Sequence, residues 1–235
     1  MAIKKREDEG LPEYFATFAD MMTLLMTFFV LLFSMSSLDP VKMADMEAAM
    51  QESATGERRE RRPIKTQSQI RDEVLEAIEQ TQMQDVAEVT HSPKGTSITI
   101  GSEFAFESGS ADLKPAMYTF LNSIIPIIMD EGNRFPVAVE GHTDNLPIPD
   151  QWTDKYPTNW ELSAGRAARV VTYCIDRGVP GQKLRASGFA DRIPYGTSWA
   201  QTRLGVSDEM VQAGNSTEEL RSSNRRVEIT FLAVG

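Results

Sequence analysis

The apolar residues of the chain are concentrated in one stretch near the N-terminus, residues 15–34, which carries a single charged side chain, Asp20. A helix rises about 1.5 Å per residue, so a helix of this length crosses a hydrocarbon core about 30 Å thick. The pattern therefore predicts a transmembrane α-helix over residues 15–37, preceded by a short N-terminal segment, residues 1–14.

Asp20 makes this helix more than an anchor. An ionised carboxylate in hydrocarbon costs about 2.5–3.5 kcal/mol on insertion scales, so it requires a polar partner, a water-filled cavity or a bound ion. On a helical wheel Thr23 and Thr27 lie on the same side as Asp20. We interpret this face as a candidate ion pathway, with the two hydroxyls as candidate ligands. The alternative is that Asp20 only reaches the headgroups at the end of the helix.

Basic residues indicate the orientation of the helix. Lys4, Lys5 and Arg6 precede it, whereas only Lys42 follows closely. Because Lys and Arg favour the cytoplasmic side, we expect the N-terminus in the cytoplasm and the remainder of the chain outside. The apolar stretch is longer than a signal-peptide core and has no convincing cleavage site after it, so we expect it to be retained.

Two segments separate the helix from the rest of the chain. Residues 40–53 carry Met43, Met46 and Met50 at helical spacing, which fits either an amphipathic helix or a weakly helical linker. Residues 54–66 contain the charged run GERRERRP and are predicted to be a solvated linker.

Residues 67–235 alternate between helical and strand periodicity. Helices are predicted at residues 67–81, at 115–130 with a kink at Pro126, and at 162–177; strands are predicted at residues 86–89, 97–100, 137–140, 184–189 and 227–232. This order predicts an α/β domain of two layers, with helices on one face of a mixed sheet. Residues 191–220 show no clear period and are predicted to be an irregular insertion with some helix near residues 208–212.

Composition excludes several function classes. The net charge is −10 over 235 residues, which argues against a nucleic-acid partner. Cys174 is the one cysteine, so no intrachain disulfide can form, and its apolar surroundings predict a buried side chain. The chain lacks a paired-histidine metal motif and a serine nucleophile elbow, so we expect no enzyme, no cofactor and no metal other than a transported Na⁺ at Asp20. His142 is predicted to be a structural hydrogen-bonding residue at a strand end.

Three polar groups should meet at one edge of the sheet: residues 142–145 (HTDN), the helix start at residues 159–170, and residues 224–226 (NRR). Asn159 is predicted to be the helix N-cap, and Arg166 lies two turns further along the same face. Asp144 and Arg166 could together hold a zwitterion by its ammonium and its carboxylate. The alternative is an Asp144–Arg166 salt bridge that only fixes the helix to the strand.

The motifs GHTDN, NWELSAGRAARVV and NRRVEI resemble, in this order, the OmpA-like peptidoglycan-binding domain, over residues 86–233. The resemblance implies that Asp144 and Arg166 hold the diaminopimelate of the cell-wall stem peptide. It also implies that Leu162 contacts the ligand and that Phe106 and Glu107 belong to the aromatic loop of the site. Residues 191–220 form a longer stretch than this family usually has.

The N-terminal sequence TFADMMTLLMTFFVLLFSMSSLD, joined to such a domain, resembles the B subunit of bacterial flagellar stators, the MotB/PomB family. The resemblance implies that Asp20 is the ion-binding residue and that residues 40–53 form a plug. It further implies an inner-membrane homodimer inside a ring of A-type subunits, which acts on the flagellar rotor while the periplasmic domain holds peptidoglycan. The order TFAD is closer to the sodium-type branch, which favours Na⁺ over H⁺. A static tether to the wall without ion conduction is the alternative function.

Overall fold

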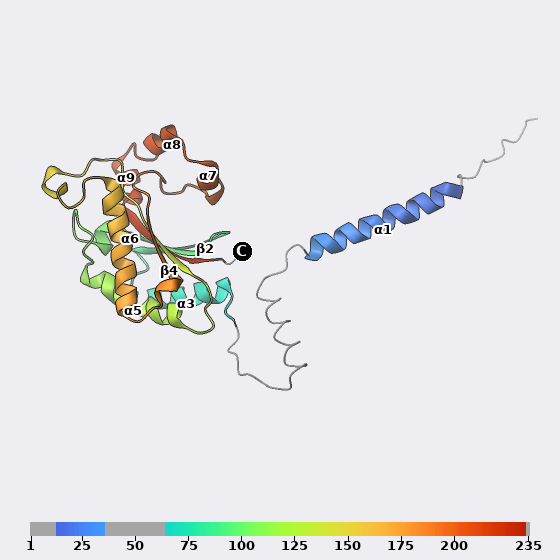
Figure 1. Cartoon of the computed structure of the whole chain (residues 1–235), viewed down its shortest axis with the longest axis horizontal. Coiled ribbons are helices and arrows are strands. Elements are labelled where there is room, and N and C mark those ends of the chain that lie inside the picture. Colours follow the sequence, from blue (N-terminus) through green and yellow to red (C-terminus); the bar gives the residue numbers. More distant parts are fainter. Residues whose placement is uncertain (1–12, 36–63, 234–235) are drawn as a thin grey trace, which may run out of the picture. The chain divides into compact units, whose positions relative to one another are not determined.

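The computed structural model describes residues 13–35 and 64–233, which belong to two separate units, residues 1–58 and 59–235 (Figure 1). The predicted plug, residues 40–53, lies outside the described residues, as do most of the predicted linker and of the N-terminal segment. Each unit is described by itself.

The first unit contains one long helix, α1 (Glu13–Met35). Its 23 residues extend for about 35 Å, and residues 14–32 are long and apolar enough to cross a membrane. The large apolar side chains, such as Leu25 and Phe29, are about half exposed or more, as expected for side chains that face lipid or a partner. The prediction of one N-terminal apolar helix is confirmed.

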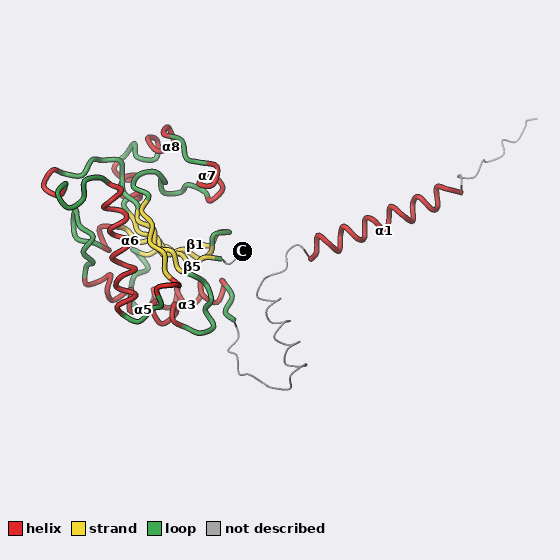
Figure 2. The backbone as a smooth tube through the Cα atoms, viewed as in Figure 1, coloured by secondary structure: helices red, strands yellow, loops and turns green. Residues whose placement is uncertain are grey.

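The second unit is built on a five-stranded sheet in the order β1-β2-β5-β3-β4. The strands are β1 (Ala87–Ser92), β2 (Gly95–Gly101), β3 (Val137–Gly141), β4 (Leu184–Gly188) and β5 (Arg226–Leu232). The strands lie together in the domain (yellow in Figure 2). The β3–β4 pair is parallel and the other pairs are antiparallel, so the sheet is mixed, as predicted. All five predicted strands are present.

Three helices cover one face of this sheet: α3 (Gln67–Gln80), α5 (Pro115–Met129) and α6 (Asn159–Asp176) (Figure 1). The strands alternate, so that every second side chain enters the core beneath the helices. The fully buried apolar strand residues are Ile98, Ile100, Val137, Val139, Val227, Ile229 and Phe231. Helix α5 continues through Pro126, and its buried apolar residues are Met117, Phe120, Leu121, Ile124, Ile125, Ile127 and Ile128. The two-layer α/β architecture is therefore confirmed.

The opposite face of the sheet is polar, because the alternate positions are Ser97, Thr99, Glu140, Glu228 and Thr230. The insertion partly covers this face: Arg226 of β5 donates hydrogen bonds to the carbonyl of Ile193 (3.3 Å), and its guanidinium lies 5.5 Å from the centre of the Tyr195 ring. The three helices therefore cover the apolar face of the sheet, and the insertion covers part of its polar face.

The insertion is more regular than predicted. It contains three short helices, α7 (Trp199–Leu204), α8 (Asp208–Ala213) and α9 (Glu218–Asn224). Two buried asparagines fix it: Asn215 accepts a hydrogen bond from the backbone N–H of Asn145 in the domain (3.2 Å), and Asn224, at the end of α9, accepts one from the backbone N–H of Tyr195 (2.7 Å). Helix α8 confirms the helix predicted near residues 208–212, whereas α7 and α9 were not predicted, because helices of six or seven residues are too short to show an apolar repeat.

The start of α6 also differs from the prediction. Thr158, not Asn159, is the N-cap, and it forms a capping box with Glu161. Asn159 is the first helical residue, and its amide donates hydrogen bonds to the carbonyls of Asp144 (3.2 Å) and Leu146 (2.8 Å). Either residue type can cap a helix, and here Asn159 holds the preceding loop instead.

Candidate functional site

A cleft of about 500 Å³ lies where β3 ends and α6 begins. Its lining includes all five residues predicted to contact peptidoglycan: Phe106, Glu107, Asp144, Leu162 and Arg166. The sheet order brings them together, because β3 leads into Asp144, α6 carries Leu162 and Arg166, and Phe106 follows the short helix α4 (Ser102–Ala105).

Two glycines bring α6 into contact with the strand ends. Gly141 of β3 and Gly188 of β4 are paired in register. A Cβ on Gly141 would lie 2.1 Å from the carbonyl oxygen of Ser163, and one on Gly188 would lie 2.4 Å from the backbone nitrogen of Ala164. The first turns of α6 therefore lie directly on β3 and β4, which fixes where Arg166 enters the cleft.

Arg166 is a buried cation bound mostly by neutral groups. It is 7% exposed, and its Nε donates to the carbonyl of Ser110 (3.0 Å) while Nη1 donates to the hydroxyl of Ser102 (3.3 Å). Its guanidinium lies 5.1 Å from the centre of the Phe106 ring, a cation–π distance. Burial lowers the pKa of Arg166 to about 10, so the side chain is still protonated at neutral pH. The result is a fixed, poorly hydrated positive charge in the cleft wall.

Asp144 supplies the negative charge, and its partner is Arg225. Asp144 is 8% exposed; Oδ2 accepts a hydrogen bond from Arg225 Nη1 (2.8 Å), and Oδ1 accepts one from the backbone N–H of Leu146 (3.2 Å). Arg225 also pairs with Glu103 and Glu218, each at 3.0 Å. Burial lowers the pKa of Arg225, but its hydrogen bonds to these three carboxylates outweigh that and raise it. The alternative of a direct Asp144–Arg166 salt bridge is not found among the described residues.

The rim of the cleft is apolar on one side. Pro147, Ile148 and Pro149 follow Asp144, and the ring of Trp152 fits closely over Gly109, where a Cβ would lie 2.2 Å from it. Gly109 also has φ +65°, which favours glycine. Sequence reasoning assigned no role to Trp152 or Ser102. It named Arg225 only as part of the NRR group, residues 224–226. The position of Arg225 in that group was the signal that could have identified it as a residue of the cleft.

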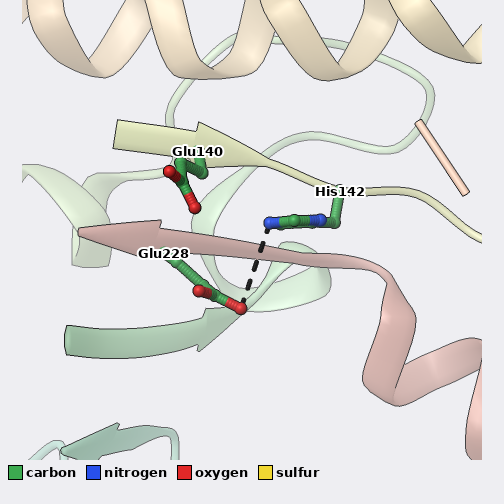
Figure 3. Close-up of side chains that lie close together, drawn as sticks. All are labelled: Glu140, His142 and Glu228. Atoms are coloured by element: carbon green, nitrogen blue, oxygen red, sulfur yellow. Dashed lines mark ion pairs between the residues drawn. The ribbon is translucent and has the colours of Figure 1, made fainter. Parts of the chain in front are cut away.

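His142 lies at the strand end, as predicted; its backbone N–H donates to the carbonyl of Arg226 (3.0 Å), but its side chain forms no hydrogen bond among the described residues. It is 1% exposed, and neither ring nitrogen has a hydrogen-bond partner among the described residues. The ring stacks on Phe189 at 5.5 Å between centroids and faces Glu228, with Nε2 3.9 Å from Oε1 (Figure 3). Burial, with the nearby Arg226 and Lys94, lowers the pKa of His142 well below 6.5. The predicted hydrogen-bonding role is therefore wrong for the side chain.

In α1 the predicted hydroxyls bond to the backbone of their own helix. Thr23 donates to the carbonyl of Asp20 and Thr27 to that of Leu24, both at 2.8 Å. Because a hydroxyl has one donor and two acceptor lone pairs, each of these oxygens keeps its lone pairs free. The face predicted around Asp20 therefore presents a carboxylate and hydroxyl oxygens as acceptors.

Comparison with known families divides the chain in the same way. Residues 3–53 match the family described as "Membrane MotB of proton-channel complex MotA/MotB", and residues 105–203 match the OmpA family. The two matches fall on either side of residues 54–104.

Two similar proteins align with nearly the whole chain. Motility protein B of Bacillus subtilis is 26% identical, over 99% of this chain and 95% of the relative. An uncharacterized B. subtilis protein, YtxE, is 29% identical, over 96% and 90% respectively. Among solved structures, the cell wall anchor of the T6SS from Pseudomonas aeruginosa aligns with a TM-score of 0.54 at 26% identity, covering 70% of this chain and 99% of that one. The chain is therefore a homologue of Motility protein B, with an OmpA-like C-terminal domain.

Proposed function

We propose that this protein is a B-type stator subunit of the bacterial flagellar motor, which couples ion flow at Asp20 to torque and anchors the stator to peptidoglycan. The observation that carries the proposal is the pairing, in one chain, of an apolar helix with a single carboxylate and a cleft with two fixed opposite charges. Its similarity over nearly its full length to a motility protein supports the same assignment.

The cleft suits the diaminopimelate of a wall stem peptide. This group carries an ammonium and a carboxylate on one carbon, and Asp144 and Arg166 offer the complementary charges in the same cleft. Arg166 is free to bind a carboxylate because its present partners are neutral oxygens and a ring. The ammonium would exchange with Arg225 at Asp144, and Leu162 would contact the aliphatic part of the ligand.

At the membrane end, ion binding neutralises Asp20 where an isolated charge is costly. The bound and free states would then favour different packings of α1 against a surrounding ring of A-type subunits. A membrane potential supplies about 2.3 kcal/mol per elementary charge per 100 mV, enough to bias such a cycle. The subunit would act as an inner-membrane homodimer, with residues 1–14 in the cytoplasm, residues 40–53 as a plug and residues 67–235 in the periplasm. The wall contact holds it while the ring acts on the rotor.

Ion flux separates this function from a static wall tether. The chain lacking residues 40–53 should conduct ions when reconstituted in liposomes with its A-type partner, and Asp20→Asn should abolish the flux because the amide cannot carry the charge that the cation neutralises. Asp20→Glu, which keeps a carboxylate, is the matched control and should retain part of the flux. Flux that is absent in the unplugged complex, or equal in Asp20→Asn, would establish the tether instead.

Peptidoglycan binding tests the other end. Arg166→Ala should weaken co-sedimentation of the full chain with purified peptidoglycan by about 10- to 100-fold, the loss expected for one charge-assisted hydrogen-bonding group. Arg169→Ala, an exposed arginine one turn further along α6, removes the same charge and should leave binding unchanged. Equal binding by both variants would show that Arg166 is structural.

A further inference from the structure

A second cluster of charged groups lies on the polar face of the sheet, outside the cleft. Glu140 and Glu228 are directly opposite each other on β3 and β5, and His142 follows β3 on the same face. Figure 3 shows the three side chains converging, and one ligand atom from each lies within 4.8 Å of the other two. Nothing in the proposed motor function uses this cluster.

The state of His142 points to a ligand. A buried polar group without a hydrogen bond is costly, by about 1–3 kcal/mol, and native proteins seldom leave one in place without a purpose. His142 is 1% exposed, its two ring nitrogens are both unpartnered among the described residues, and Nε2 faces the carboxylate of Glu228. No protein hydrogen bond among the described residues occupies either nitrogen, so a ring lone pair is available for coordination.

We propose that Glu140, His142 and Glu228 form a binding site for a divalent transition metal ion of the zinc class. One imidazole and two carboxylates are ligands that Zn²⁺ accepts at about 2.0–2.2 Å, usually with four ligands in total and water in an open position. Two ligand atoms at the tetrahedral angle around such an ion are about 3.3–3.6 Å apart. His142 Nε2 and Glu228 Oε1 are 3.9 Å apart, so a shift of a few tenths of an ångström would bring them to this separation.

Two cations compete with the metal. Lys94 pairs with Glu140, and Arg226 Nε donates to Glu228 Oε1 at 2.7 Å. Arg226 is buried and also bonds backbone carbonyls, so it can keep those contacts, whereas Lys94 extends from the β1–β2 turn and is partly exposed. A metal would therefore displace Lys94 from Glu140. This exchange predicts that removing the lysine charge strengthens metal binding.

An ion can reach the site from solvent. A cavity of about 630 Å³ between the sheet and the insertion is lined by all three ligands and by Lys94. Glu140 and His142 lie at the end of β3 and directly after it, whereas Glu228 lies on the neighbouring strand β5, far from both in the sequence, so no local metal motif marks the three together.

Zinc titration of the tag-free full chain in detergent tests the site. After treatment with a chelator, isothermal titration should show one Zn²⁺ per chain. His142→Gln and Glu228→Gln should each weaken binding by about 100-fold, at the upper end of losses seen for supporting residues of metal sites. Lys94→Gln, at the surface, should tighten it by about tenfold. His91→Gln is the matched control, since His91 is the other histidine and lines the same cavity.

Circular dichroism of each variant distinguishes loss of the site from loss of the fold. A folded His142→Gln or Glu228→Gln chain that binds Zn²⁺ as tightly as the wild type would overturn the proposal. A wild-type chain that binds no stoichiometric Zn²⁺ would also overturn it, and so would a Lys94→Gln chain whose affinity for Zn²⁺ is unchanged or reduced. Neither of these two measurements uses a variant of a buried ligand, so misfolding of such a variant cannot affect them.

Discussion

At the scale of single residues, the two arginines of the cleft have different tasks. Arg225 is surrounded by Asp144, Glu103 and Glu218, so its charge is already compensated. Arg166 has neutral hydrogen-bond partners and forms no ion pair among the described residues, so an incoming carboxylate could pair with it directly. In the proposed function, Arg166 would contribute affinity for an anion, whereas Arg225 would hold Asp144 in place until a ligand ammonium replaces it.

Cys174 gives a pH-dependent prediction at the same scale. The thiol is 3% exposed, and burial raises its pKa from 9.0 to about 11. The folded state therefore keeps its proton where the unfolded chain loses it, so its contribution to stability is complete below pH 9 and is lost as the pH rises to about 11. The loss should reach about 3 kcal/mol in the free energy of unfolding.

Chemical denaturation of wild type and Cys174→Ala at pH values from 8 to 11 measures this effect. Because other groups titrate in the same interval, the difference between the two chains is the relevant quantity. It should shrink as the pH rises. Parallel pH curves for the two chains would show that the thiol does not contribute.

At the scale of elements, the contact between α6 and the strand ends determines the cleft. Gly141→Ala would place a methyl group 2.1 Å from the carbonyl oxygen of Ser163, so α6 must move away from β3. Overpacking of this kind costs about 1–3 kcal/mol, and we expect a loss of this size in the free energy of unfolding, with weaker peptidoglycan binding. Gly101→Ala is the matched control, since a Cβ there meets nothing within 4 Å. If the free energy of unfolding and the peptidoglycan binding of Gly141→Ala were both unchanged, the contact between α6 and β3 would have adjusted to the methyl group without cost.

The elements also show which features of the fold and of the cleft could be predicted from the sequence. Alternating strands and apolar helix faces were predictable, because burial of one face imposes a period on the residues. Asp144 and Arg166 were located in one site by motif order, but the Asp144–Arg225 pair was missed. That pair depends on β5 lying next to β3, a sheet order that no local pattern encodes. The isolation of His142 was missed for the same reason, since it results from the packing of Phe189 and β5 around it.

At the scale of the whole molecule, the proposed function needs both units in one chain. Ion binding at Asp20 produces motion only if the domain with Arg166 is held by the wall, and wall binding alone produces no motion. The two activities should therefore be separable in the purified protein but not in a swimming cell. This distinguishes a stator from a tether, for which Asp20 would be dispensable.

Swimming cells that depend on this chain give the last prediction. In the proposed function, the free lone pairs of Thr23 and Thr27 would add oxygen ligands on the face of Asp20, which Na⁺ needs and a proton does not. Swimming speed should therefore rise with external Na⁺ and fall towards zero when K⁺ replaces it at constant pH. Cells with Arg166→Ala should not swim at any Na⁺ concentration, while Arg169→Ala cells should follow the wild type. Undiminished swimming in K⁺ would assign the motor to protons, and full swimming with Asp20→Asn would remove the ion pathway from this helix altogether.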